Sequence, residues 1–356
     1  MNSTSGYEEA TPRHFLWSPI EITRFVLLIS AGCTIVLFNT LIIILIAKYR
    51  KLRTWTNCLL LSMAVADLLV GVLSIPTHLI ADVSLLGKHI MWCIVLNIPT
   101  VIIPTASIMS LIAASVERLL AIASPLRYPL WISRRRILIT VIFIWVYSVT
   151  LGLLPVFGWN NIEERRKTNH PLRDCNFAAV MSGHYTGLFI AGNIFPGMVF
   201  LLCLNIKLFI IVKSQRSKAP SIGNISRSGS VAGLNDGRQA PHVPQTPVQR
   251  SRRVVFILLV ICHVTILCYI PVCVAFVVDY QWFTVTTITE WRAPYILYAI
   301  GTFLGAINSL VNPVILGFAN REIRKHLKLM CRLNLTKSDS SNSMSLIMCS
   351  ANRQLS

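Results

Sequence analysis

Residues 94–118 read IVLNIPTVIIPTASIMSLIAASVER, an apolar run that contains no charge until it ends in Glu117-Arg118. At 1.5 Å per residue, about 20 such residues cross a hydrocarbon core of roughly 30 Å, so the run predicts a membrane-spanning helix. A charged pair at the edge of hydrocarbon is costly unless it faces a protein interior or water. Glu117 and Arg118 are therefore either a functional pair or an ordinary charged helix end, and the dipeptide alone leaves both interpretations open.

The composition of the whole chain is that of a membrane protein. Of its 356 residues, 54% are hydrophobic and only 13% are charged, and the mean hydropathy is +0.63. A soluble domain usually carries about 25% charged residues. The sequence therefore predicts an all-α membrane protein with seven apolar helices, at about 23–47, 57–81, 92–116, 137–157, 183–212, 254–278 and 293–318.

The basic residues lie mainly on one side of these helices. Of the 33 lysines and arginines, 25 are Lys207 or fall in the segments 48–56, 117–136, 213–253 and 319–356. Cytoplasmic loops of membrane proteins carry such an excess, so we expect the N-terminus outside the cell and the C-terminus inside. A basic face beside anionic membrane lipid explains the net charge of +19, and a nucleic-acid partner is not needed.

The surroundings of the charged pair resemble a known family. Cys93 lies 25 residues before Arg118, and Pro125-Leu126-Arg127-Tyr128 follows it. This combination resembles the third helix and second intracellular loop of rhodopsin-like (class A) G-protein-coupled receptors, whose Asp/Glu-Arg-Tyr motif ends here in Leu119. The resemblance covers residues 23–333 and includes a match to Asn-Pro-x-x-Tyr in the last helix. It implies a seven-helix receptor in which four residues govern activation and G-protein coupling: Glu117, Arg118, Asn312 and Pro313.

Asp67 lies near the middle of the second apolar run, where inserting a carboxylate costs on the order of 3 kcal/mol unless it is compensated. In the resembled family, an inward aspartate at this place binds sodium with partners from helices 3 and 7. The matching partners here are Ser107, Asn308 and Asn312. Oxygen ligands of this kind suit a small hard cation. We expect these four residues to form either an allosteric sodium site or a purely structural hydrogen-bond network, and we expect no other cofactor.

The third helix departs from the family where ligands usually bind. Pro99 and Pro104 each remove a helix hydrogen bond, so we expect a kink or local unwinding there. Thr100 occupies the position at which amine receptors carry an aspartate, and no acid occurs from Met91 to Val116. A cationic amine ligand held by the usual ion pair is therefore not expected.

Other residues resemble the adenosine, sphingolipid and cannabinoid receptor branch. Phe157-Gly158-Trp159 is one such match. Phe177, two residues after Cys175, is similar to the adenosine-receptor phenylalanine that stacks on the ligand, although it is equally a candidate loop-packing residue. The asparagine that holds adenine would fall at Phe276, where the match fails. The expected ligand is an extracellular, non-aminergic small molecule, adenosine-like or lipid-like. The expected pocket consists of Thr100, Pro104, Phe177, Tyr269, Phe276 and Thr302.

Three covalent modifications are expected from this topology. Cys93 and Cys175 are the only cysteines that it places at the outer ends of the helices, so we expect them to form a disulfide in an oxidising compartment. Asn2-Ser3-Thr4 is a glycosylation acceptor on the outer side. Basic residues lie opposite apolar residues from 319 to 333, as in an amphipathic helix on the inner membrane leaflet, and Cys331 is a palmitoylation candidate.

The expected organisation places the receptor in the plasma membrane as a multi-pass protein. Its parts are an extracellular N-terminus (1–22), a seven-helix receptor domain (23–318) with a disordered third intracellular loop (about 214–250), an amphipathic helix (319–333) and a cytoplasmic tail (334–356).

Other classes of protein fit less well. A secondary transporter or channel would need internal repeats, broken helices at the midplane and usually more than one buried charge. An enzyme would need a Ser/His/Asp set, a metal-ligand spacing or a phosphate loop, and none occurs in the sequence. A receptor with weak or no G-protein coupling is a closer alternative, because four motif residues are replaced, by Leu119, Leu204, Tyr269 and Leu316.

The residues at the cytoplasmic ends of the expected helices lead to one expectation about signalling. Many relatives hold the helix 3 arginine with a second acid, on helix 6, and Ser251 occupies that place here. Losing this contact predicts signalling without agonist. The expected partners are a heterotrimeric G protein, arrestin, receptor kinases, membrane lipid and the extracellular ligand.

Overall fold

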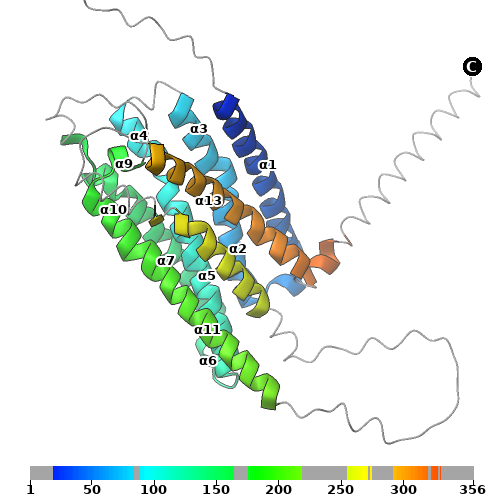
Figure 1. Ribbon diagram of the computed structural model, residues 1–356. Helices are drawn as coiled ribbons and strands as arrows, with labels where there is room; N and C mark the ends of the chain where they lie inside the picture. Colours follow the sequence, from blue (N-terminus) through cyan, green and yellow to red (C-terminus); the bar gives the residue numbers. More distant parts are fainter. Residues whose placement is uncertain are drawn as a thin grey trace, which may run out of the picture.

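The computed structural model of the chain describes residues 19–83, 89–163, 175, 177–218, 255–271, 273–274, 292–319, 322–327 and 329. Within these residues long helices run side by side (Figure 1), and strand pairing is limited to a single bridge between Asn160 and Met181. The predicted all-α fold is confirmed.

Five described helices are long and apolar enough to cross a membrane, and two shorter apolar helices follow them. The five spans contain α1 (Pro19–Lys48), α2 with α3 (Trp55–Leu69, Ile75–Val83), α4 with α5 (Ile90–Asn97, Pro99–Ala123), α7 (Arg134–Leu153) and α10 with α11 (Gly183–Phe189, Phe195–Lys218). The shorter two are Val255–Pro271 and Phe303–Leu316, the second within α13 (Arg292–Ala319). Each of the seven falls on one of the predicted apolar runs.

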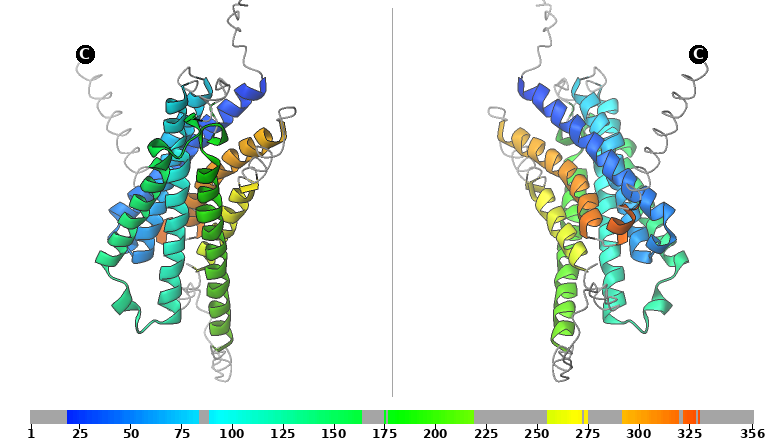
Figure 2. Two further views of the ribbon diagram at one scale, coloured as in Figure 1. Left: turned by 90° about the vertical axis from the view of Figure 1, so that its left-hand side faces the viewer. Right: turned by 90° about the vertical axis from the view of Figure 1, so that its right-hand side faces the viewer.

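The two ends of the bundle carry different short elements. One end of the bundle carries α4 and α9 (Phe177–Val180), and the first turns of α1 and α13 lie at the same end. At the other end lie α6 (Tyr128–Trp131) and the last turns of α11 (Figures 1 and 2). The predicted disulfide between Cys93 and Cys175 is formed at the first of these ends. We call the two ends the disulfide end and the α6 end.

The break in the third membrane span confirms one of the two proline expectations. α4 ends at Asn97 and α5 begins at Pro99, so Ile98 forms a turn between them. Because Pro99 has no N–H to donate to Val95, the N–H of Ile98 donates to that carbonyl instead, at 3.2 Å. Pro104, in contrast, lies inside α5 and does not interrupt it, so of the expected kink or local unwinding, the unwinding does not occur at Pro104. One missing backbone hydrogen bond is tolerated where neighbouring helices pack around it.

Two spans contain a wider π-helical turn that the sequence pattern did not indicate. These turns are η2 (Val70–Ser74), between α2 and α3, and η5 (Ile190–Ile194), between α10 and α11. Gly71 of η2 lies against α1, so closely that a Cβ added to it would lie 2.9 Å from the carbonyl oxygen of Gly32. A π turn inserts an extra residue and is often found at functional sites.

Apolar side chains face outward as well as inward. On α7, Phe143 is 60% exposed while the next residue, Ile144, is 2% exposed. A soluble helix would cover its outer face with polar residues, whereas lipid accepts apolar side chains there.

Candidate functional site

A buried carboxylate at the α6 end receives four hydrogen bonds. Glu117, on α5, is 2% exposed, and the guanidinium of Arg118 donates to both of its oxygens, from Nε to Oε2 at 2.7 Å and from Nη2 to Oε1 at 2.6 Å. Thr56, in the first turn of α2, donates to Oε2 at 2.7 Å, and the hydroxyl of Tyr128 on α6 donates to Oε1. Glu117 therefore ties Arg118, α2 and α6 together.

Tyr128 stays protonated in this arrangement. Burial, and then the hydrogen bond and charge of Glu117, raise the pKa of Tyr128 above its ordinary value. The hydroxyl therefore remains a donor to Glu117 at neutral pH. Neither Tyr128 nor Thr56 was among the predicted site residues.

A second buried carboxylate, Asp67 on α2, lies at the polar centre of the bundle. It is 1% exposed. Ser309 donates to its Oδ1 at 2.9 Å, Asn312 donates to its Oδ2 at 2.8 Å, and Ser107 lies 3.4 Å from Oδ1. The contacts come from α5 and α13, so the structure brings together Asp67 with the predicted Ser107 and Asn312.

The fourth predicted member of this cluster has a different partner. Asn308 accepts a hydrogen bond of 3.0 Å from Thr265, on helix Val255–Pro271, and is not bonded to Asp67. The place expected for Asn308 is taken by Ser309, which sequence reasoning missed. The carbonyl of Ser309 also accepts from Asn39 of α1, at 3.1 Å. Asn312 Oδ1, next to the carboxylate, is buried and has no hydrogen-bond partner among the described residues.

A cavity of about 110 Å³ lies toward the disulfide end. Its lining is mainly apolar and comes from α1, the η2 and η5 turns, α3, α5, α10, helix Val255–Pro271 and α13. The side chains with polar atoms that line it are Ser74, His78, Thr100 and Tyr269. Among the described residues around this cavity, none carries a carboxylate.

Only some of the predicted pocket residues line this cavity. Thr100, Pro104 and Tyr269 line it. Phe177 does not, because it is fully buried in α9, with its ring 5.9 Å from that of Phe189 and 6.2 Å from that of Tyr185. Phe189 lines the cavity in its place.

Several predicted residues are beyond what the structure describes. Thr302 lies in α13, but its side chain is outside the described part of the chain, as are residues Asn2, Ser251, Phe276 and Cys331. Pro313, beside Asn312, lies inside α13.

The buried Asp67 and the Glu117-Arg118 pair lie in one bundle of membrane-spanning helices. The family model described as 7 transmembrane receptor (rhodopsin family) matches residues 38–316. The chain belongs to this family. Membership makes it a multi-pass membrane receptor and not an enzyme, with a heterotrimeric G protein and a small-molecule ligand as the kinds of partner the family implies.

The receptor has curated relatives at moderate identity. The human histamine H2 receptor is 30% identical over 301 residues, which cover 83% of this chain and 76% of the relative. The guinea pig (Cavia porcellus) histamine H2 receptor is 30% identical over 321 residues, 88% of this chain and 81% of the relative. The octopamine receptor beta-1R of Drosophila melanogaster is 28% identical over 308 residues, 82% of this chain and 58% of the relative. These relatives do not support the expected adenosine, sphingolipid and cannabinoid branch.

Proposed function

We propose that this receptor binds an uncharged or weakly charged small molecule, adenosine-like or lipid-like, in the cavity at the disulfide end and activates a heterotrimeric G protein at the α6 end. The observation that carries the ligand half is the lining of the cavity. Thr100, in place of the amine-receptor aspartate, lines it, and its described polar groups are neutral hydroxyls and an imidazole. Such groups recognise a ligand by hydrogen bonds, and an ammonium ion would lack a counter-charge there.

An amine ligand is the second candidate, because the relatives are named for histamine and octopamine. Both molecules are amines and would gain most from a carboxylate in the pocket. For this candidate, the acid would have to come from residues outside the described part of the chain. The two candidates therefore differ in whether the ligand carries a positive charge.

The test is a ligand library applied to cells that express the receptor, with G-protein dissociation as the readout. The library includes histamine, octopamine, adenosine analogues and neutral lipids. We expect a response to a compound without a strong positive charge, and a weaker response when Thr100→Asp places a carboxylate in the cavity. Thr150→Ala, an exposed position on α7, serves as the control for expression. High-affinity activation by an aromatic amine that is lost in Thr100→Ala would overturn the proposal.

At the α6 end, the proposed coupling surface comprises Arg118 with the neighbouring loops and the amphipathic helix that the sequence predicts at 319–333. Leu126, at 94% exposure, and Leu130, at 72%, are apolar side chains close to basic residues at this end. Exposed apolar groups rimmed by polar ones are typical of protein contact sites. The excess of lysine and arginine on this side supports a cytoplasmic position for it, with the N-terminus outside.

The same orientation supports several secondary proposals. Asn2 would be glycosylated outside the cell, and Cys331 would be palmitoylated at the inner leaflet. Arrestin and receptor kinases would share the cytoplasmic face with the G protein, and membrane lipid would contact the basic 319–333 segment.

Sodium is proposed as an allosteric ion at the polar centre. The free Oδ1 of Asn312 and the carboxylate of Asp67 are buried oxygens within one cluster, which fits a small hard cation. Ser107 and Asn308 would complete the set with Asn312 and Asp67, as the sequence suggests, and Ser309 would add a further hydroxyl.

A further inference from the structure

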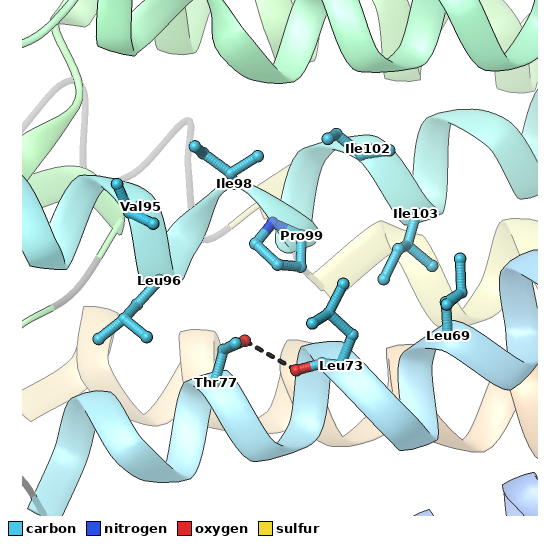
Figure 3. Close-up of a pocket in the computed structure, with 9 residues that line it drawn as sticks. All are labelled: Leu69, Leu73, Thr77, Val95, Leu96, Ile98, Pro99, Ile102 and Ile103. Atoms are coloured by element: carbon cyan, nitrogen blue, oxygen red, sulfur yellow. Dashed lines mark hydrogen bonds between the residues drawn. The ribbon is translucent and has the colours of Figure 1, made fainter.

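An apolar groove of about 290 Å³ lies between α2 with α3 and α4 with α5, separate from the cavity that holds the proposed ligand (Figure 3). Pro99 and Ile103 form part of its wall and are buried, with Ile103 at 1% exposure. Leu73 and Val95 line it as well and are 42% and 41% exposed. The groove therefore runs from the outer surface of the bundle to a buried floor.

The described lining of the groove has no free polar group to offer an occupant. Among the described lining residues, Thr77 alone has a polar side chain, and its hydroxyl donates to the carbonyls of Leu73 and Ser74, at 2.9 and 3.0 Å. Figure 3 shows the bond from Thr77 to Leu73 within the same helix. A buried hydroxyl or charge on an occupant would lose its hydrogen bonds to water without replacement. The occupant must therefore be plain hydrocarbon.

The helix break at Ile98 shapes this groove. Ile98 and Ile102 line it and also pack on α7, where a Cβ at Gly152 would lie 2.3 Å from Ile102 and 3.6 Å from Ile98. Both walls belong to membrane spans, Trp55–Ala81 and Ile90–Ala123. The groove is thus continuous with the lipid-facing surface. We propose that it is a specific binding site for one acyl chain of a membrane phospholipid.

An occupant of the groove would touch the back of the ligand cavity. In three pairs of consecutive residues, the first lines the groove and the second lines the cavity. These pairs are Leu73 and Ser74, Pro99 and Thr100, and Ile103 and Pro104. Filling the groove supports these segments from the lipid side, so the acyl chain and the ligand share two walls. The lipid site itself stands independently of the proposed ligand.

Photolabelling tests the site directly. The full-length receptor is placed in lipid nanodiscs that contain phosphatidylcholine with a diazirine on one acyl chain, and labelled peptides are identified by mass spectrometry. We expect the label to concentrate in residues 69–77 and 95–103. Leu73→Trp fills the groove and should reduce that labelling about tenfold, equivalent to about 1.4 kcal/mol of binding free energy. The matched control is Val72→Trp, a 55% exposed neighbour that does not line the groove.

A second pair of variants protects the test against a folding failure of the first. Val95→Trp fills the groove from α4, and Met91→Trp, one turn earlier and 48% exposed, is its control. Equal labelling of all lipid-facing helices, or equal losses in the groove and control variants, would overturn the proposal. Preferential labelling by a photoreactive sterol over the phospholipid would also overturn it, because it would identify a different occupant.

Discussion

At the scale of single residues, the Glu117 carboxylate decides how firmly Arg118 is held. Tyr128→Phe removes one of its four donors and leaves the ring in place. A hydrogen bond to a charged group contributes about 1.5–3 kcal/mol. We therefore expect Tyr128→Phe to loosen the Arg118 contact and to raise basal G-protein activation by up to about tenfold. The measurement is basal activation per receptor at the cell surface.

Tyr147→Phe is the control for this variant, because Tyr147 donates to Asn193 on a different part of the bundle, at 3.3 Å. A basal rise of the same size in both variants would contradict the role of Glu117.

The raised pKa of Tyr128 also sets the direction in which pH changes the stabilisation by this contact. Because the pKa of Tyr128 is raised, its contribution is complete below the ordinary tyrosine value of about 10 and is lost only as the pH rises through the higher folded value.

The residues around Asp67 give a second prediction at this scale. If sodium binds there, Asp67→Asn should abolish the effect of sodium on basal signalling while the receptor still reaches the surface. Ser309→Ala should weaken that effect more than Asn308→Ala, because Ser309 is bonded to Asp67 and Asn308 is bonded to Thr265. Titrating NaCl against an osmotically matched salt of a larger cation gives the measurement. An unchanged sodium response in Asp67→Asn would rule out the site.

Sequence reasoning found the carboxylates, Asn312 and Ser107 at these sites but missed the hydroxyls of Ser309, Thr56 and Tyr128. A carboxylate in an apolar run, such as Asp67, must find partners, so its role is readable from sequence. Serine and threonine need no such partner, since their hydroxyls often bond to their own helix, as Thr34 and Ser148 do. Ser309 and Thr56 therefore looked no different from their neighbours until the fold was known.

At the scale of elements, the contact between α1 and the η2 turn depends on Gly71. A methyl group at Gly71 would lie 2.8 Å from Val36 and 2.9 Å from the backbone oxygen of Gly32. The backbone cannot yield as a side chain does, so we expect Gly71→Ala to destabilise the receptor by about 1–3 kcal/mol. Gly187→Ala, in a helix with nothing within 4 Å of its Cβ, is the control. Thermal unfolding of the two purified variants should separate them, and equal melting temperatures would contradict this packing.

The elements were predictable to the extent that a local chemical rule applied. Apolar length identified the spans, and the missing N–H of Pro99 indicated the break at Ile98. At Pro104 the lost bond does not end the helix, because packing around α5 compensates one lost bond. The π turns η2 and η5 had no such signal, because a π turn inserts one extra residue without a missing N–H to mark its place.

At the scale of the whole molecule, three sites are spaced along one bundle. The cavity lies toward the disulfide end, the Glu117 cluster lies at the α6 end, and Asp67 lies between them with partners on α5 and α13. Tyr269 of the cavity and Thr265 of the central network lie on the same helix, Val255–Pro271. Thr100 of the cavity and Ser107 of the network both lie on α5. A ligand that favours one arrangement of these helices can therefore shift the balance at the α6 end through its differential affinity for the two states.

The final prediction concerns the fraction of receptor that is active without agonist. Arg118 is held by Glu117, yet Ser251 offers no second acid where many relatives have one, and the neighbouring Arg250 and Arg252 would repel a guanidinium. A missing charge-assisted hydrogen bond of about 1.5–3 kcal/mol raises the active fraction by about tenfold or more. Replacement of family motif residues, tyrosines among them, by Leu119, Leu204, Tyr269 and Leu316 acts in the opposite direction. We expect basal activation above background, reduced in Ser251→Glu but not in Ser251→Gln, when G-protein dissociation is normalised to surface receptor. A natural chain at background level, with no decrease in the glutamate variant, would instead indicate that the lost tyrosines dominate and that the receptor couples weakly.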